Sequence, residues 1–141
     1  MTGAGAPAVA CAGLTVSYGE VRALDGVSFE IAPGELFGLL GPNGAGKTTT
    51  LKVLTTLLTP AAGEARVFGL DVRSRAMAVR RLLGYVPQQL SADSGLTAYE
   101  NVWLFARLFD VPRAVRGERI HEVLDWMGLS EASDRLVSTY S

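Results

Sequence analysis

The sequence predicts an α/β fold followed by a helical part, and three features support this. Residues 9–18 and 21–31 are rich in β-branched and aromatic residues, and Gly19-Glu20 between them is typical of a tight hairpin turn. An apolar run, a glycine-rich loop and a helical pattern then follow in direct succession. After Gln88 the composition changes to a polar loop, and the pattern beyond that loop is helical. We therefore expect three segments: a flexible N-terminus at 1–8, an α/β core at 9–90 and a helical subdomain at 91–141.

Composition and charge narrow the class of protein. The chain has 141 residues, 48% hydrophobic and 19% charged, as in an ordinary globular domain. Its net charge of -1 offers no electrostatic footprint for nucleic acid or an anionic bilayer, so no nucleic-acid partner is expected. Cys11 is the only cysteine, which excludes an internal disulfide and favours a reducing cytoplasm. No run of about 18 apolar residues is present, so the chain should not cross a membrane by itself.

The core elements can be placed from local patterns. Residues 32–35 should form a turn, and the apolar run 36–40 suits a central strand covered on both faces. Leucines recur at helical spacing from Lys47 until Pro60 stops the helix. Three further elements are expected: a strand or hairpin at 64–72, a helix at 74–82 with Arg80 and Arg81 exposed, and a short strand at 84–86.

The second part should contain two helices after a polar loop at 89–95. Thr97 and Glu100 match a capping box, so the first helix should begin near Ala98. Pro112 should end it, and Gly128 is in position to cap a second helix that begins near Arg113. The residues expected to share the buried face of the first helix are Val102, Phe105 and Phe109.

Residues 41–48, GPNGAGKT, fit the P-loop pattern of Gly, four residues, Gly-Lys and Ser or Thr. Its glycines allow successive N–H groups to turn around an oxyanion, and the N-terminus of the following helix reinforces the attraction for phosphate. Lys47 adds a positive charge, Thr48 a hydroxyl for Mg²⁺, and Thr49 a further donor. A glycine-rich surface turn is the alternative, but the position between an apolar run and a helix argues against it. The residues predicted to bind ATP with Mg²⁺ are Gly41, Pro42, Asn43, Gly44, Ala45, Gly46, Lys47, Thr48 and Thr49.

Other segments stand in a fixed order around this loop: VSYG at 16–19, LDGVSF at 24–29 and GYVPQ at 84–88. With GPNGAGKTT at 41–49, they resemble the N-terminal part of an ABC transporter ATP-binding subunit, from about Val9 to Ser141. The resemblance implies a P-loop NTPase fold of the ABC type, with a mixed sheet core, an antiparallel β-subdomain and an incomplete helical subdomain. Within the family, the GYVPQ segment and the ending TYS look most like bacterial multidrug and daunorubicin-resistance efflux ATPases.

The resemblance also implies roles for single residues. Tyr18 would stack on adenine, and Gln88 would contact Mg²⁺ or the attacking water and couple nucleotide state to the helical subdomain. The catalytic residues would thus be Lys47 and Gln88, and the metal ligands Thr48 and Gln88. From the residues alone, Tyr18 could instead be a strand-end aromatic packed on its neighbours, and Gln89 could take the place of Gln88. Either glutamine could also be an ordinary loop residue.

Hydrolysis of the nucleotide by a P-loop protein needs a second site that carries a carboxylate. The segment of this sequence that most resembles such a site is a poor match. Asp71 follows an apolar segment, but Gly69 interrupts the strand and Val72 stands where a glutamate should be, so Asp71 is expected to be a hairpin residue. His121 is expected to be a solvated surface residue. By the resemblance, Ser141 would begin the signature motif, and the Walker B carboxylates would lie beyond it. These 141 residues alone are therefore expected to bind nucleotide without turnover.

The resemblance implies partners and a place in the cell. The full-length protein would hydrolyse ATP in a head-to-tail dimer with a second ATP-binding subunit. It would bind a membrane-spanning subunit at the cytoplasmic face of the membrane and power export of drugs or other small molecules. Trp103 or Phe105 could contact that subunit, although helical periodicity favours core packing for both.

Two rival functions remain. A small P-loop GTPase or kinase is weakened because neither Asn43 nor Asn101 begins the Asn-Lys-x-Asp segment that reads guanine. A non-transport ATPase of the ABC type, acting in DNA repair or on ribosomes, keeps the family but changes the partner. A phosphate or lipid contact by the arginine cluster is also conceivable, but a solvated helix face is the favoured interpretation for Arg73, Arg75, Arg80 and Arg81.

Overall fold

The computed structural model describes residues 6–87 and 92–140. The chain divides into two compact units between Tyr85 and Val86, and each is described by itself. Gln88, Gln89, Ser141 and the first five residues, about which expectations are stated above, lie outside the described residues.

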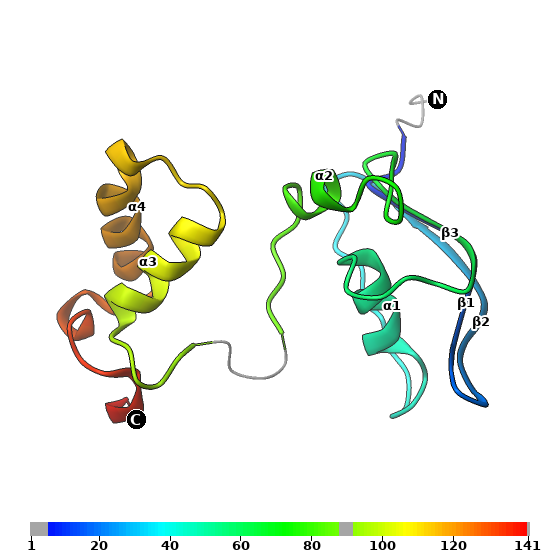
Figure 1. The fold of residues 1–141 in the computed structure, drawn as a ribbon, viewed down its shortest axis with the longest axis horizontal. Helices are drawn as coiled ribbons and strands as arrows, with labels where there is room; N and C mark the ends of the chain where they lie inside the picture. The colour runs from blue at the N-terminus through cyan, green and yellow to red at the C-terminus, as the bar shows by residue number, and fades with distance from the viewer. Residues whose placement is uncertain (1–5, 88–91, 141) are drawn as a thin grey trace. The chain divides into compact units, whose positions relative to one another are not determined.

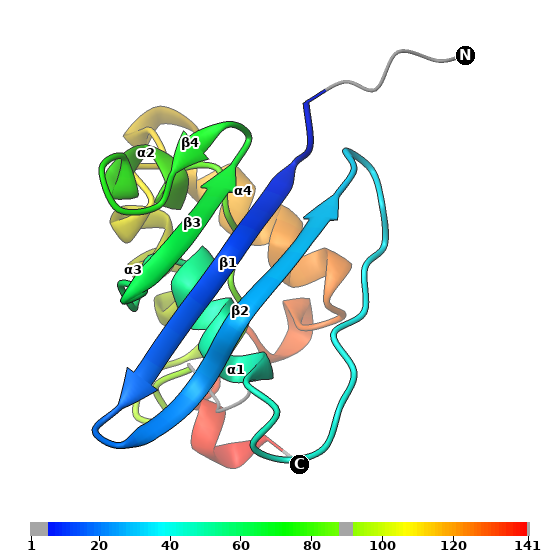
Figure 2. The same ribbon diagram turned by 90° about the vertical axis from the view of Figure 1, so that its right-hand side faces the viewer.

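The first unit contains an antiparallel sheet with the strand order β2-β1-β3-β4. Strands β1 (Val9–Tyr18) and β2 (Val21–Ile31) confirm the predicted hairpin to the residue. The hairpin of β3 (Ala62–Val67) and β4 (Leu70–Asp71) was expected within 64–72. Figure 2 shows the sheet in front of helix α1.

Helix α1 (Lys47–Leu54) supplies the second layer of this unit. Its Val53 and Leu54 join a core with side chains from the sheet, including the fully buried Leu14. Cys11 belongs to the same core, and burial raises the pKa of its thiol to about 11, so the thiol is neutral at physiological pH. The P-loop helix is therefore anchored on the face of an antiparallel sheet.

Helix α1 ends well before Pro60, where the sequence placed its end. The chain leaves the helix at Thr56, which has a left-handed backbone with φ of 61°. The N–H groups of Leu57 and Leu58 both donate to the carbonyl oxygen of Lys52, at 2.8 and 3.0 Å. These two hydrogen bonds tighten the last turn of the helix. The spacing of the leucines in the sequence does not predict them.

The strands predicted at 36–40 and 84–86 are wrong for the described structure. Both segments lie outside every helix and strand. Leu36 is 100% exposed, Leu40 93% and Val86 92%. A strand needs a neighbour for its backbone N–H and C=O groups, and within residues 6–87 and 92–140 neither run pairs with one. The described sheet is accordingly antiparallel throughout.

The second unit is helical, as expected, with α3 (Ala98–Leu108) and α4 (Arg113–Trp126) (Figure 1). The capping box is confirmed: Glu100 N–H donates to Thr97 Oγ1 at 3.1 Å, and Thr97 N–H donates to Glu100 Oε2 at 2.9 Å. The turns η1 (Ser130–Ala132) and η2 (Val137–Thr139) follow.

Gly128 ends α4 as predicted. It has a φ of 66°, and its N–H donates to the carbonyl oxygen of Asp125 at 2.9 Å. The next N–H, of Leu129, reaches back to the carbonyl oxygen of Leu124 at 2.8 Å. This pair of bonds is the Schellman arrangement, in which glycine is favoured because of its positive φ.

The buried face of α3 differs from the predicted one. Phe105 is 38% exposed and Phe109 63%, whereas Asn101 is only 6% exposed. The Asn101 amide accepts from Asp93 N–H at 2.7 Å and donates to the carbonyl oxygens of Asp93 and Thr97 at 2.9 and 3.0 Å. Because these hydrogen bonds satisfy its polar atoms, the Asn101 side chain can be buried. The apolar periodicity had instead placed Phe105 and Phe109 on the buried face.

The core between α3 and α4 is small. Ala98, Ile120 and Leu124 are buried, and partly buried side chains that include Val102 pack against them. Trp103 is 41% exposed, so the core packing that periodicity favours for Trp103 and Phe105 is wrong for both. No helix in the described parts is long and apolar enough to span a membrane.

Candidate functional site

The glycine-rich loop at 41–46 leads directly into α1. Three of its glycines have positive φ: 155° at Gly41, 85° at Gly44 and 84° at Gly46. Residues with a β-carbon rarely adopt such conformations, so the glycines permit this path. Ala45 N–H donates to the carbonyl oxygen of Pro42 at 3.2 Å, which closes a turn at the tip. Residues 41–46 thus form a loop whose path depends on its glycines, as the P-loop pattern predicts.

Gly46 fixes the loop to the sheet. A β-carbon at this position would lie 2.5 Å from Leu24 Cδ2 and 2.6 Å from the carbonyl oxygen of Ala23, both in β2. The carbonyl oxygen of Gly46 also accepts from the N–H and the hydroxyl of Thr50, at 2.8 and 3.0 Å. Close backbone packing therefore sets where α1 begins.

The start of α1 keeps donors available. Gly46 is the N-cap, it provides no side-chain cap, and the first turn holds no acidic residue. The N–H groups of a first turn have no partner within their own helix, and the helix dipole makes this end electropositive. An anion at the loop would meet both effects.

Lys47 lies against this loop. Its Nζ donates to the carbonyl oxygens of Gly41 and Pro42, both at 2.7 Å. An ammonium group has three protons, so one donor remains beyond these two bonds. The positive charge is thus held at the beginning of the loop.

The threonines that follow differ in exposure. Thr48 is exposed, whereas Thr49 is 9% and Thr50 2% exposed. A metal ligand at Thr48 agrees with this exposure. Little of the Thr49 side chain reaches solvent, so its expected role as a phosphate donor would depend on its backbone or on a small adjustment.

Tyr18 ends β1 and is 48% exposed. Both ribbon views place the β1–β2 turn and the glycine-rich loop at the same end of the first unit (Figures 1 and 2). The second expected partner of the nucleotide, Gln88, lies outside the described residues.

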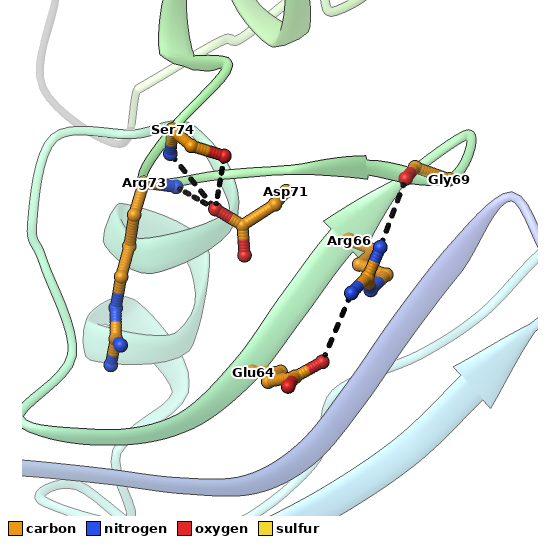
Figure 3. A network of polar contacts seen from close by, with 6 residues as sticks. All are labelled: Glu64, Arg66, Gly69, Asp71, Arg73 and Ser74. Atoms are coloured by element: carbon orange, nitrogen blue, oxygen red, sulfur yellow. Dashed lines mark hydrogen bonds and ion pairs between the residues drawn. The ribbon is translucent and has the colours of Figure 1, made fainter.

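Asp71 is a turn-capping residue (Figure 3), as the expected hairpin role requires. Its Oδ1 accepts from Ser74 N–H at 2.8 Å, Ser74 Oγ at 2.9 Å and Arg73 N–H at 3.0 Å. These bonds, that of the Ser74 N–H foremost, hold the pKa of Asp71 below its usual value. The carboxylate is thus committed to the turn that leads to α2 (Ala76–Arg80).

Replacing Asp71 by Asn should reduce the acid sensitivity of the fold. A depressed pKa in the folded state stabilises the protein above the unfolded pKa of about 3.9, and that stability is lost as pH falls through the folded pKa. Urea unfolding between pH 7 and pH 2 should therefore show a shallower loss below about pH 4 in Asp71→Asn. The control is Asp25→Asn, which removes a carboxylate whose ion pair with Arg22 is exposed. Equal acid slopes in wild type and Asp71→Asn would contradict the prediction.

Two arginines of the cluster make hydrogen bonds to the chain that follows α1. Arg73 Nη2 donates to the carbonyl oxygen of Pro60 at 2.7 Å, and Arg80 Nε donates to Thr56 Oγ1 at 2.6 Å. Both residues are exposed, as expected for a solvated face, and their hydrogen bonds also tie them to the connection between α1 and β3.

The remaining residues considered in the sequence analysis, Arg75, Arg81 and His121, lie at the surface. Arg75 and Arg81 are exposed. His121 is exposed as expected, with its ring centroid 5.5 Å from that of Tyr99. Within the described ranges, no group of three or more His, Cys, Asp and Glu side chains is placed to hold a metal ion.

Comparisons with known proteins agree with this geometry. The chain is 46% identical to the daunorubicin/doxorubicin resistance ATP-binding protein DrrA of Streptomyces peucetius, covering 95% of this chain and 41% of that protein. It is 43% identical to the Nod factor export ATP-binding protein I of Paraburkholderia xenovorans, covering 89% and 41%. The chain thus spans about two fifths of the length of these relatives.

A solved structure of the ATP-binding subunit of an ABC transporter matches with a TM-score of 0.80 and 26% identity, covering 94% of this chain and 55% of that one. The predicted ABC-type fold is thereby confirmed, although the sheet of the described residues is antiparallel and not mixed. The family model described as ABC transporter matches residues 24–141. Proteins of this family are ATPases that use ATP, generally with Mg²⁺. With its glycine-rich loop and its fold, the chain belongs to the ABC transporter family.

Proposed function

We propose that this chain binds the phosphates of ATP through residues 41–49. The observation that carries the proposal is the position of Lys47, whose Nζ bridges the carbonyl oxygens of Gly41 and Pro42 at 2.7 Å. It places a cation beside a loop with positive φ at three glycines and beside a helix start with available N–H groups. Backbone donors and one ammonium group together suit a triphosphate.

The residues present fit ATP and Mg²⁺. Apart from Gly44 and its two chain neighbours, no atom lies within 4 Å of the place where a β-carbon at Gly44 would stand, so the tip of the loop is open. We assign Thr48 and Gln88 as the metal ligands and Lys47 and Gln88 as the catalytic residues. Mg²⁺ would supply charge neutralisation of the phosphates. The exposed hydroxyl of Thr48 at the helix start is the donor that supports this assignment.

The adenine ring is assigned to Tyr18. Tyr18 is 48% exposed and ends β1, and the β1–β2 turn that follows it lies at the same end of the first unit as the glycine-rich loop. Stacking of a base on an aromatic ring contributes about 1–3 kcal/mol and discriminates weakly among bases. Tyr18 would therefore add affinity more than selectivity.

For the whole protein, we propose ATP hydrolysis that powers the export of drugs or other small molecules. The support is the similarity to proteins named for daunorubicin and doxorubicin resistance and for Nod factor export. This function implies a membrane-spanning subunit, a second ATP-binding subunit in a head-to-tail dimer, and a peripheral position at the cytoplasmic face of the membrane.

For these 141 residues alone, we propose binding without turnover. Asp71 is the residue of this sequence that most resembles a Walker B carboxylate. Its Oδ1 accepts three hydrogen bonds from its own turn. Hydrolysis needs a carboxylate that is available to Mg²⁺ or to the attacking water.

Calorimetric titration of the 141-residue chain with Mg-ATP tests the binding proposal. We expect saturable binding of one equivalent and weaker binding when Mg²⁺ is chelated. Absence of saturable heat in a chain with an intact circular dichroism spectrum would refute the site. In parallel, steady phosphate release should not exceed that of Lys47→Ala, and release above that level would refute binding without turnover.

A further inference from the structure

A second candidate site lies in the helical unit, between α3 and α4. A cavity of about 450 Å³ opens there, lined by Tyr99, Trp103, Arg107, Arg113, Arg116 and Gly117. Three of the six lining residues are arginines, two are aromatic, and none is acidic. No residue of the P-loop belongs to this cavity, so it requires a separate explanation.

Helical spacing explains how these side chains meet. Tyr99, Trp103 and Arg107 are four residues apart along α3 and therefore form one stripe on its surface. Arg113 and Gly117 have the same spacing on α4. Apart from the chain next to Gly117 in its own helix, no atom lies within 4 Å of a β-carbon built there, so this glycine leaves room at the cavity.

Among residues 6–87 and 92–140, no acidic side chain forms an ion pair with the three arginines of this cavity. The ion pairs of the described residues involve other arginines, namely Arg22, Arg66 and Arg119. Arg113 stands at the start of α4, where the first turn has neither an acidic residue nor a side-chain cap. The dipole of α4 is positive at this end, whereas Arg107 lies in the last turn of α3, where the dipole is negative, so the positive potential of the cavity comes mainly from the three guanidinium groups.

Two of the guanidinium groups are already oriented. Arg116 donates through Nε and Nη2 to the carbonyl oxygen of Val111, at 3.2 and 2.7 Å, which holds its planar group at the helix connection. Arg107 lies over the ring of Trp103 with its Cζ 5.2 Å from the ring centroid. Ordering of these long side chains before a ligand arrives lowers the entropic cost of binding.

We propose that this cavity binds a phosphate group, carried by a soluble phosphate ester or by a phospholipid headgroup. Guanidinium groups match phosphate oxygens through paired N–H donors, and three of them exceed what one carboxylate would need. The nearly neutral net charge of the chain makes this a local site and not a general polyanion surface. The site acts independently of nucleotide binding at the P-loop.

The test uses Trp103 as a local reporter. Trp126, the other tryptophan, is 73% exposed, so Trp126→Phe leaves a folded chain with a single tryptophan inside the proposed site. Inorganic pyrophosphate, titrated at constant ionic strength into this variant and into its Lys47→Ala derivative, should change Trp103 fluorescence saturably in both. The derivative removes the P-loop contribution from the signal.

Charge-neutral variants then locate the site. Arg107→Gln combined with Arg113→Gln should weaken pyrophosphate binding about tenfold or more. The matched control is Arg119→Gln on the same helix, outside this cavity and paired with Glu122 at 3.0 Å. It should leave the dissociation constant unchanged, and circular dichroism should show all variants folded.

The source of the phosphate is distinguished with glycerol phosphate and with vesicles. A response to free glycerol phosphate supports a soluble ester. A response to phosphatidylglycerol vesicles, but not to phosphatidylcholine vesicles or glycerol phosphate, supports a headgroup. The proposal is overturned if Trp103 responds to no phosphate, if Arg119→Gln weakens binding equally, or if only an acidic peptide binds.

Discussion

Lys47→Ala should weaken Mg-ATP binding by at least about a hundredfold. The ammonium group is the only lysine charge at the loop, and its Nζ is positioned by two carbonyl oxygens at 2.7 Å. Its loss removes charge-assisted hydrogen bonds to phosphate and leaves the loop carbonyls without a donor. Calorimetric or fluorescent-nucleotide titration measures the loss, and circular dichroism checks that the fold is retained.

The chain provides a matched control for this variant. Lys52, the only other lysine, lies on the same helix in its last turn and is exposed. Lys52→Ala should leave Mg-ATP affinity within about twofold, because a surface charge away from the ligand contributes little. Lys47→Gln keeps a donor for Gly41 and Pro42 but removes the charge, so it should bind nearly as poorly as Lys47→Ala. Unchanged affinity in Lys47→Ala would exclude the loop as the nucleotide site.

Local patterns predicted the elements that local forces determine. The β1–β2 hairpin, the Thr97 capping box and the Gly128 cap each depend on residues close together in sequence, and each is confirmed. The run 36–40 is different, because an apolar run becomes a strand only when a partner strand supplies hydrogen bonds. Sequence shows the apolar character of Leu36 and Leu40 but not the partner.

The candidate sites show the same limit. The P-loop could be found because its glycines, Lys47 and Thr48 lie within one short segment. The sequence pattern therefore predicts the local geometry by itself. The arginine cavity joins residues of α3 to residues of α4, and the turn that brings them together comes from Asp110, which has a φ of 55°, and Pro112. The four-residue spacing of Tyr99, Trp103 and Arg107 was a signal, but it did not indicate which arginines would face it.

Gly46→Ala should destabilise the first unit by about 3 kcal/mol. The φ of 84° at this position already costs an L-residue about 1–2 kcal/mol. The added methyl group would also stand 2.6 Å from the carbonyl oxygen of Ala23 and 2.5 Å from Leu24 Cδ2. Leu24 can change its rotamer, but the Ala23 carbonyl belongs to β2, so the loop must move away from the sheet. Urea unfolding followed by circular dichroism measures the cost.

Gly44→Ala separates backbone strain from this contact. Gly44 has nearly the same φ, 85°, but nothing lies within 4 Å of its added β-carbon. Its cost should therefore be backbone strain alone, about 1–2 kcal/mol. Equal destabilisation by the two variants would mean that the close packing of Gly46 against β2 adds nothing to the cost of the substitution. A larger cost for Gly46→Ala, accompanied by weaker Mg-ATP binding, would show that the contact with Ala23 sets both the start of α1 and the shape of the loop. The sheet would then influence nucleotide binding through its backbone contact with Gly46, in addition to the proposed stacking of Tyr18 on adenine.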